Sequence, residues 1–230
     1  MSADFLKFPD TPHLIWLGTA AVRQDKVLAC VDAESFLRQG VIVEEKVDGA
    51  NLGIRFDSHG NLLAQNRANL VGRGTKDQFA PLWKWLADRE TKLFDTLEDR
   101  LILFGEWCYA RHSIHYTRLP DFFLAFDIFD KREQQFMSSP RRDEIAAELD
   151  LATVPKVGEG VFSLSGISSL IGPSFLYDGP MEGIYLRQEN PTWLIQRAKV
   201  VRAEFVQQIG EHWSKQPLVV NRLERVTSSP

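Results

Sequence analysis

Residues 40–56 read GVIVEEKVDGANLGIRF, and this stretch holds two strand-like patterns on either side of a charged turn. Residues 40–45 form a short β-branched run that ends in charge, which predicts a strand. Residues 52–56 alternate apolar side chains with glycine and arginine, as a strand with one buried face does. Lys46 leaves the first strand just before the turn. We therefore expect its amine to extend from a strand end into a pocket.

The rest of the chain alternates further strand-like and helix-like segments. A turn at residues 58–61 leads into a returning strand that ends at Arg67, which predicts a hairpin. Apolar residues at helical spacing predict one or two amphipathic helices over residues 76–98, outside the sheets. The other expected elements are strands over residues 100–107, 122–129, 181–187 and 193–202, a helix over residues 139–149 with Pro140 near its start, and a last helix through Phe205, Ile209 and Trp213. Strands joined by hairpins, with helices inserted between them, predict an α+β fold with mainly antiparallel sheets and peripheral helices.

Composition and charge narrow the class of protein. The chain has 230 residues, 44% of them hydrophobic, and a net charge of -4, which argues against a general polyanion-binding surface. Any nucleic-acid contact must then come from a local basic cluster. Cys30 and Cys108 are too few for a disulfide framework, and the sequence has neither an apolar signal core nor an apolar run long enough to span a bilayer. We therefore expect a soluble cytoplasmic protein with no membrane partner.

No internal repeat and no linker-like stretch divides the chain, so we expect one domain over residues 1–230. Prolines and a glycine predict an irregular lead-in over residues 1–20. The polar tail over residues 215–230 is expected to be loose.

Lys46 stands in a K-x-D-G pattern whose residues suit phosphate chemistry. Gly49 lets the backbone approach a ligand closely, and Asp48 can hold a metal ion or its waters. A free lysine amine has a pKa of about 10.4, so a nucleophilic lysine must lose its proton, which nearby cations or partial burial favour. The pattern alone is weak evidence, because four residues with one free position also form ordinary turns.

Five further elements follow the lysine in order. Each is ordinary alone, since a buried phenylalanine, a solvated glutamate or a pair of exposed cations is common. Together, at consistent spacing, they are hard to obtain by chance. Arg197 and Lys199 also share a strand face, because residues two apart point the same way. The elements are Asn66-Arg67, Phe104-Gly105-Glu106-Trp107, Phe126-Asp127-Ile128-Phe129, Met181-Glu182-Gly183-Ile184 and Arg197-Ala198-Lys199.

This order resembles the covalent nucleotidyltransferase superfamily of DNA ligases, RNA ligases and mRNA capping enzymes, over roughly residues 41–202. The closer likeness is to RNA ligases of the second T4 type and related bacterial RNA-repair ligases. Their lysine motif continues to an asparagine five residues on, as Asn51 does here, and they have an aromatic strand like the one with Phe126 twenty residues after Glu106. The opening over residues 8–14 also looks like the start of some of these ligases.

The resemblance implies a ligase-type adenylation domain and an ATP-dependent RNA ligase that uses Mg²⁺ and seals 3′-OH and 5′-phosphate RNA ends, as in RNA repair. Lys46 would attack the α-phosphate of ATP, release pyrophosphate and hold AMP as a phosphoramidate. Glu45 and Phe126 would lie at the adenine, the first through its main chain. Glu106 would bind the ribose hydroxyls, and Arg67 would meet the ribose or the phosphate of the RNA 5′ end.

The remaining implied roles concern charge and the later steps. Lys199 and Arg197 would contact the α-phosphate, although the family usually has lysine where this chain has Arg197. Glu182 and Asp48 would orient a hydrated Mg²⁺, which lowers the pKa of the amine. Asn51 would act on the adenylylated strand.

A second departure from the family lies after the last motif. Only 28 residues follow Arg202, so we expect no OB-fold domain and no counterpart of its pyrophosphate-orienting motif. Either the catalytic domain works alone, or a partner subunit helps to bind the substrate.

Three alternatives stay open beside an RNA ligase. One is a minimal DNA ligase, and another is a nucleotidyltransferase that adenylylates proteins or 5′ ends without sealing. The third is a non-catalytic nucleic-acid binder, against which the retention of Lys46, Glu182 and Lys199 argues. The natural RNA, whether a nick, a tRNA break or a single strand, also stays open.

Cys108, His112 and His115 have a spacing that could hold zinc, but a fourth ligand at suitable spacing is missing. The same stretch mixes aromatic rings with cations, so it fits a polar surface loop and an RNA-contacting loop equally well.

Overall fold

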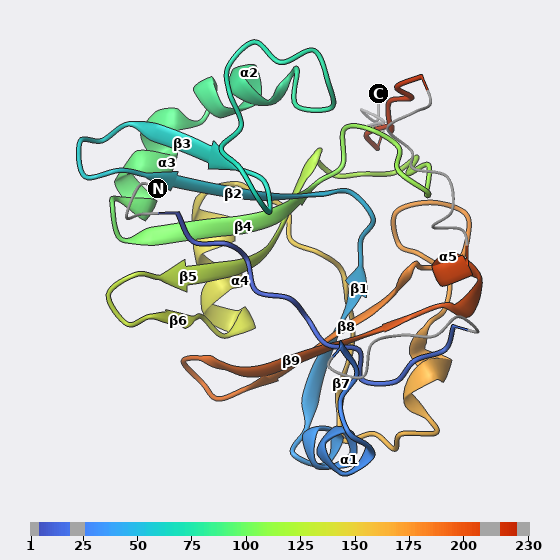
Figure 1. Ribbon diagram of the computed structural model, residues 1–230. Helices are drawn as coiled ribbons and strands as arrows, with labels where there is room; N and C mark the ends of the chain where they lie inside the picture. The colour runs from blue at the N-terminus through green and yellow to red at the C-terminus, as the bar shows by residue number, and fades with distance from the viewer. Residues whose placement is uncertain (1–4, 19–25, 208–216, 225–230) are drawn as a thin grey trace, which may run out of the picture.

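The computed structural model describes residues 5–18, 26–207 and 217–224, and its strands form two antiparallel sheets (Figure 1). The four-stranded sheet has the order β7-β1-β8-β9 and consists of β1 (Val41–Lys46), β7 (Lys156–Gly160), β8 (Gly183–Glu189) and β9 (Leu194–Val201). The five-stranded sheet has the order β3-β2-β4-β5-β6 and consists of β2 (Ala50–Phe56), β3 (Leu62–Gln65), β4 (Leu101–Trp107), β5 (Phe123–Asp130) and β6 (Gln135–Phe136).

Helices pack on both sheets and bury a separate apolar core on each. Helix α1 (Cys30–Arg38) places Phe36 and Leu37 in one core with Val43 of the four-stranded sheet. Three helices share another core with the five-stranded sheet: α2 (Leu82–Ala87), α3 (Glu90–Leu97) and α4 (Ser139–Glu148). Two short helices complete the described part of the chain, the 3₁₀ helix η2 (Ile167–Leu170) and α5 (Ala203–Gln207).

The chain changes sheets between β1 and β2. Lys46, the last residue of β1, pairs with Gly183 at the start of β8. Ala50, the first residue of β2, pairs with Trp107 at the end of β4. The turn at residues 47–49 therefore connects the two sheets (Figure 1), so a side chain beside this turn reaches the space that both sheets border.

The predicted α+β fold with mainly antiparallel sheets and peripheral helices is confirmed. The hairpin is β2–β3, and the helical region over residues 76–98 divides into α2 and α3. The sequence patterns did not predict α1, β6 and β7. Strand β7 reads KVGEG, which has two glycines and little apolar character, so its place in the sheet depends on pairing with β1. Of the expected last helix, Ile209 and Trp213 lie outside the described residues.

Both ends of the described chain lie against the sheets or their loops. Residues 5–18 have no helix or extended strand, but His13 forms a parallel bridge with Lys199 of β9. The described part of the tail, residues 217–224, is not loose: Val220 bridges Ala110, and Leu223 bridges Leu119. Its Asn221 is 2% exposed.

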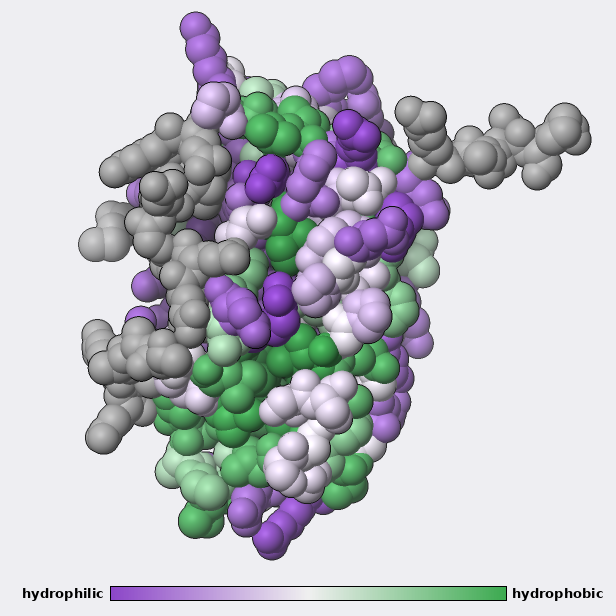
Figure 2. All heavy atoms as spheres, turned by 90° about the vertical axis from the view of Figure 1, so that its right-hand side faces the viewer, coloured by the Kyte–Doolittle hydropathy of each residue, from purple (hydrophilic) through white to green (hydrophobic). Residues whose placement is uncertain are grey.

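Figure 2 views the molecule from the right-hand side of Figure 1. Apolar residues gather on the lower half of that face, at the level of α1, and hydrophilic residues are more frequent above them. No helix in the described ranges has the length and apolar character needed to cross a membrane.

Candidate active site

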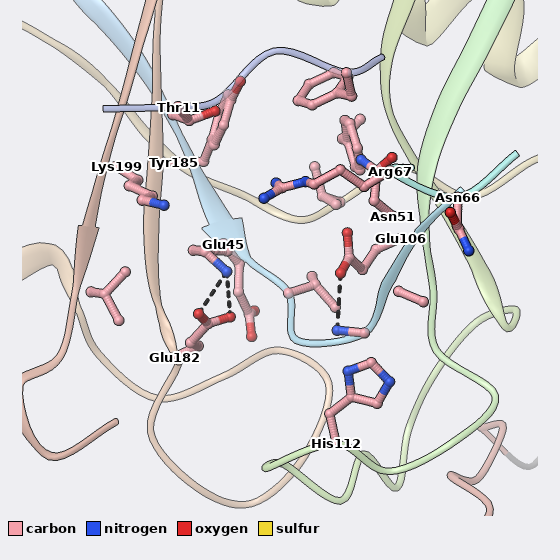
Figure 3. Close-up of a pocket in the computed structure, with 18 of the residues that line it drawn as sticks. Thr11, Glu45, Asn51, Asn66, Arg67, Glu106, His112, Glu182, Tyr185 and Lys199 are labelled. Atoms are coloured by element: carbon pink, nitrogen blue, oxygen red, sulfur yellow. Dashed lines mark hydrogen bonds and ion pairs between the residues drawn. The ribbon is translucent and has the colours of Figure 1, made fainter. Parts of the chain in front are cut away.

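A cavity of about 850 Å³ is lined by residues of both sheets (Figure 3). Small-molecule sites in proteins enclose roughly 300–1,000 Å³, so the cavity has the size of a ligand site. Asp48 and Arg197 do not line it, whereas the other eight predicted site residues do. Those eight are Glu45, Lys46, Asn51, Arg67, Glu106, Phe126, Glu182 and Lys199.

Lys46 forms an ion pair with Glu182, whose two carboxylate oxygens each lie 2.6 Å from Nζ (Figure 3). The pairing of β1 with β8 places them together, because Lys46 is opposite Gly183, the residue after Glu182. Burial lowers the pKa of Lys46, but the nearby carboxylates of Glu182 and Glu106 outweigh burial and raise it above its ordinary value. In this arrangement the amine is a paired ammonium, and burial alone does not activate it.

Glu182 and Glu106 are two acidic groups in a confined space beside Lys46. Burial raises the pKa of Glu182 to about 7 and that of Glu106 to about 8, although Lys46 lowers both. Glu106 lies on β4 beside the K-x-D-G turn and accepts a hydrogen bond at 3.0 Å from the Gly49 backbone N–H. A Cβ at position 49 would lie 2.8 Å from the Trp107 carbonyl oxygen, so the close approach of the turn to β4 requires glycine.

Phe126 reaches the cavity through a β-bulge in β5. Phe104 of β4 pairs with Asp127 and Gly105 pairs with Ala125, which leaves Phe126 without a partner in the ladder. Such bulges redirect a side chain and are common beside active sites. The Phe126 carbonyl oxygen instead accepts hydrogen bonds from Nη1 of Arg142 at 2.9 Å and of Arg187 at 3.0 Å.

Both arginines belong to a network of buried charges. Arg142 and Arg187 are 2% and 0% exposed, and each has an ion pair with Glu44, at 2.7 and 3.9 Å. Arg187 also pairs with Asp127 at 2.6 Å. Because Glu44 and Arg187 belong to the four-stranded sheet and Asp127 to β5, the network ties the two sheets together next to Phe126.

The two cations on β9 have different surroundings, although they share a strand face. Lys199 lines the cavity, and burial followed by repulsion from Lys46 lowers its pKa to about 8. Arg197 instead pairs with Asp127 at 3.0 Å, and its guanidinium lies 4.0 Å from the Phe136 ring centre. The structure therefore does not place Arg197 among the cavity residues and gives it a contact with the buried network.

Asp48 is also directed away from the cavity. Its Oδ2 accepts hydrogen bonds from the backbone N–H groups of Ser113 and Ile114 at 2.7 and 3.0 Å. Its own N–H donates to the Tyr116 hydroxyl at 2.8 Å. Asn221 supports this loop from the tail, because its Oδ1 accepts from the Tyr116 N–H at 2.9 Å. Asp48 thus anchors the K-x-D-G turn to the loop that follows β4.

Three other predicted residues line the cavity, and they differ in how firmly their surroundings hold them. The Glu45 carboxylate is buried and accepts from Ser174 Oγ at 2.5 Å and from the Phe175 N–H at 3.0 Å, so its side chain holds a neighbouring loop. Asn51 pairs with Glu106 in the ladder between β2 and β4. Arg67 is half exposed and extends across the cavity toward Lys199 (Figure 3).

Four cavity residues of the lead-in were not predicted as site residues from the sequence: Phe8, Thr11, His13 and Trp16. The resemblance of residues 8–14 to other ligases was the one signal that pointed to them. The Cys108, His112 and His115 cluster does not assemble into a metal site, since His112 bonds Gln78 and His115 bonds the Val220 carbonyl. Within the described ranges, no group of three potential metal-binding side chains is found.

The RNA ligase family model matches residues 39–201, which include all ten predicted site residues. This chain belongs to the RNA ligase family. A comparison with curated protein sequences finds no match.

Solved RNA ligases from Naegleria gruberi have the same fold as this family member. One mutant in the apo form has a TM-score of 0.63 at 17% identity, over 91% of this chain and 59% of its own. Another mutant, with ATP and Mn, has a TM-score of 0.64 at 16% identity, over 90% and 59%. The ligase with PPi has a TM-score of 0.62 at 19% identity, over 91% and 63%. This chain therefore spans less than two thirds of the length of these ligases.

Proposed function

We propose that this RNA ligase family member is an ATP-dependent RNA ligase that carries AMP on Lys46 and joins 3′-OH and 5′-phosphate RNA ends in cytoplasmic RNA repair. The observation that carries the proposal is the ion pair of Lys46 with Glu182 at the wall of a nucleotide-sized cavity. The Naegleria gruberi ligases of the same fold, solved with ATP and Mn and with PPi, support a nucleotide in this cavity.

The cavity residues suit the parts of a nucleotide. The half-buried Phe126 ring lines the cavity and offers an aromatic face on which a purine stacks. Glu106 presents a carboxylate that can accept from ribose hydroxyls. Lys199 and Arg67 place positive charge on facing walls for phosphate groups.

In the proposed first step, Lys46 Nζ attacks the α-phosphorus of ATP, an N–P bond forms, and the bond to pyrophosphate breaks. The ammonium must give up a proton, and Glu182 is the carboxylate hydrogen-bonded to it. AMP then passes to the RNA 5′-phosphate, and the 3′-OH of the second end displaces AMP and closes the strand. Lys199 stabilises charge that develops on the α-phosphate, since it is a cation that lines the same cavity.

A divalent cation, Mg²⁺ in this proposal, fits the carboxylates present. Glu182 and Glu106 are hard oxygen donors, and burial raises their pKa values because it disfavours the charged carboxylates, which a bound cation would stabilise. Glu182 would hold the ion; Asp48 is a weaker candidate, because its Oδ2 already accepts two hydrogen bonds. When bound, the ion screens the phosphates and lowers the pKa of the amine.

The decisive experiment incubates the protein with labelled ATP and Mg²⁺. We expect a covalent AMP adduct that is stable to alkali and lost in acid, as a phosphoramidate is, and that Lys46→Ala abolishes. ATP should outcompete GTP. An alkali-labile adduct, or one that persists in Lys46→Ala, would contradict the assignment of the nucleophile.

Matched nicked RNA and nicked DNA duplexes then separate the alternatives. Sealing of RNA in preference to DNA supports an RNA ligase, whereas the reverse indicates a minimal DNA ligase. An enzyme that labels Lys46 but seals neither duplex either adenylylates other acceptors or needs a partner subunit for substrate grip. Adding candidate partners to the same assay distinguishes those two cases.

A further inference from the structure

The segment around His13 is held directly against β9 of the cavity. The Leu14 N–H donates to the Lys199 carbonyl oxygen at 2.8 Å, and the Lys199 N–H donates to the Pro12 carbonyl oxygen at 3.0 Å. On its other side, His13 donates its N–H to the Lys26 carbonyl oxygen at 2.7 Å and accepts from the Leu28 N–H at 2.9 Å. His13 thus bridges β9 on one side and residues 26–28 on the other, so its backbone position is well defined.

The bridge between His13 and Lys199 directs the His13 side chain to the cavity. Successive side chains of a strand point to opposite faces, and bridge partners share a face. Leu14 is buried in the same core as Ala198 and Val200 of β9. His13 pairs with Lys199, and both line the cavity. The lead-in therefore adds an imidazole beside the lysine that we assign to the nucleotide phosphates.

One nitrogen of this imidazole has no hydrogen-bond partner among the described residues. His13 Nδ1 is buried and makes no hydrogen bond within the described part of the chain. A buried polar atom without a partner costs roughly 1–3 kcal/mol, so such an atom at a cavity wall is suited to an occupant. The neighbouring Trp16 meets the ring edge-on, with ring centres 4.9 Å apart, and limits its rotation.

The charges around His13 favour an anionic occupant. Burial lowers the pKa of His13 to about 4, with further contributions from Lys199, Lys46 and Lys26 in that order, so the ring is neutral at pH 7. A neutral imidazole donates one N–H and accepts at the other nitrogen. The larger effect of Lys199 on this pKa agrees with the bridge between the two residues, so His13 lies nearer to Lys199 than to the proposed nucleophile.

We propose that His13 is a further binding residue of this site, which donates an imidazole N–H to the β- or γ-phosphate of the nucleoside triphosphate and to the pyrophosphate that leaves. The inference rests on the proposed function, because it assumes that Lys46 meets the α-phosphate. The lead-in then helps to recognise the pyrophosphate leaving group, which is part of ATP and absent from AMP.

Binding measurements in a Lys46→Ala background test this role of His13, because without the proposed nucleophile no AMP adduct forms during the measurement. We expect His13→Ala to weaken binding of ATP and of pyrophosphate by about 10-fold, the effect of one hydrogen bond to a charged group, and AMP binding by less than about twofold. His13→Asn, whose side-chain amide can donate near the position of Nδ1, should recover most of the ATP affinity. His59→Ala, in the exposed turn between β2 and β3, serves as the matched control. Thermal unfolding confirms that each variant is folded.

Equal losses for ATP and AMP in His13→Ala would overturn the assignment and indicate a structural role for the lead-in. Unchanged ATP and pyrophosphate affinity would overturn it as well. Failure of the proposed function gives a different result, because then the protein with Lys46 intact forms no AMP adduct with ATP. In that case the binding comparison still decides whether His13 recognises a triphosphate.

Discussion

The Phe126 carbonyl oxygen lies 3.0 Å from Nη1 of Arg187, although the two residues are separated by 61 positions in the sequence. This hydrogen bond replaces a ladder bond that the β-bulge at Phe126 has removed. Arg142 donates to the same oxygen from α4. The ring that we assign to the adenine is therefore positioned by two buried arginines, whose charges are paired with Glu44 and Asp127.

We predict that Arg142→Met lowers the free energy of unfolding by about 3–5 kcal/mol, because it leaves the buried Glu44 carboxylate without its closer partner. The double variant Glu44→Gln/Arg142→Met should recover a large part of this loss, since it removes both charges. Arg132→Met, on the exposed loop after β5, is the control and should change stability by less than about 0.5 kcal/mol. Denaturant unfolding measures all three. A double variant as unstable as Arg142→Met would show that the unpaired carboxylate is not the cause.

The second prediction concerns Glu106 and pH. The pKa of Glu106 is about 8 in the folded protein and near 4.5 when unfolded, so the folded state binds more protons between these values. Its contribution to stability is thus present below pH 4.5 and is lost as pH rises through 8. Glu106→Gln keeps an oxygen for the Gly49 N–H but cannot ionise. We expect the variant to gain roughly 1–3 kcal/mol relative to the unmodified protein at pH 8, and nothing at pH 4.5.

Comparing Glu106→Gln with the unmodified protein at each pH cancels the contributions to stability of the groups that titrate in both. Glu182, with a raised pKa near 7, contributes with the same sign, and His13, with a lowered pKa, contributes with the opposite sign. Calorimetry or denaturant unfolding at pH 5, 6.5 and 8 provides the values. A stability difference that does not change with pH would mean that Glu106 has an ordinary pKa.

Asp48 provides the third prediction. We expect Asp48→Ala to speed amide hydrogen exchange at Ser113 and Ile114 by about 10-fold or more, because both N–H groups lose the carboxylate that accepts from them. Asp95→Ala, on the exposed side of α3, is the control. Unchanged exchange, combined with a higher Mg²⁺ requirement for adenylylation, would instead support the metal role that the sequence suggested for Asp48.

The fourth prediction separates the steps of ligation. Asn51 lines the cavity and pairs in the ladder with Glu106, but its neutral amide is not needed for attack on the α-phosphate. Asn51→Ala should form the Lys46 adduct almost normally and seal a pre-adenylylated RNA nick about 10²–10³-fold more slowly. Both rates are measured on one preparation of folded variant. Equal losses in the two steps would indicate that Asn51 supports the structure of the turn.

Local patterns in the sequence predicted most of the fold. The alternation in residues 52–56 and the β-branched run before Lys46 correctly predicted strands. The expectation of one buried face was wrong for residues 52–56, because all five are buried, including Arg55. Gly49 marks the close approach of the turn to β4, which the structure confirms at the Trp107 carbonyl. Strand β7 escaped prediction because its glycine-containing sequence has no such alternation.

The sequence by itself determined which strand ends with Lys46 and that Lys199 and Arg197 share a face. Tertiary structure decided which of the two cations reaches the cavity, since Arg197 meets Asp127, a partner 70 residues away. It also decided that Asp48 anchors a loop and that His13 lies beside Lys199. The physical reason is that side-chain direction and pKa depend on burial and on charges brought together by folding, such as Glu182 and Glu106 around Lys46.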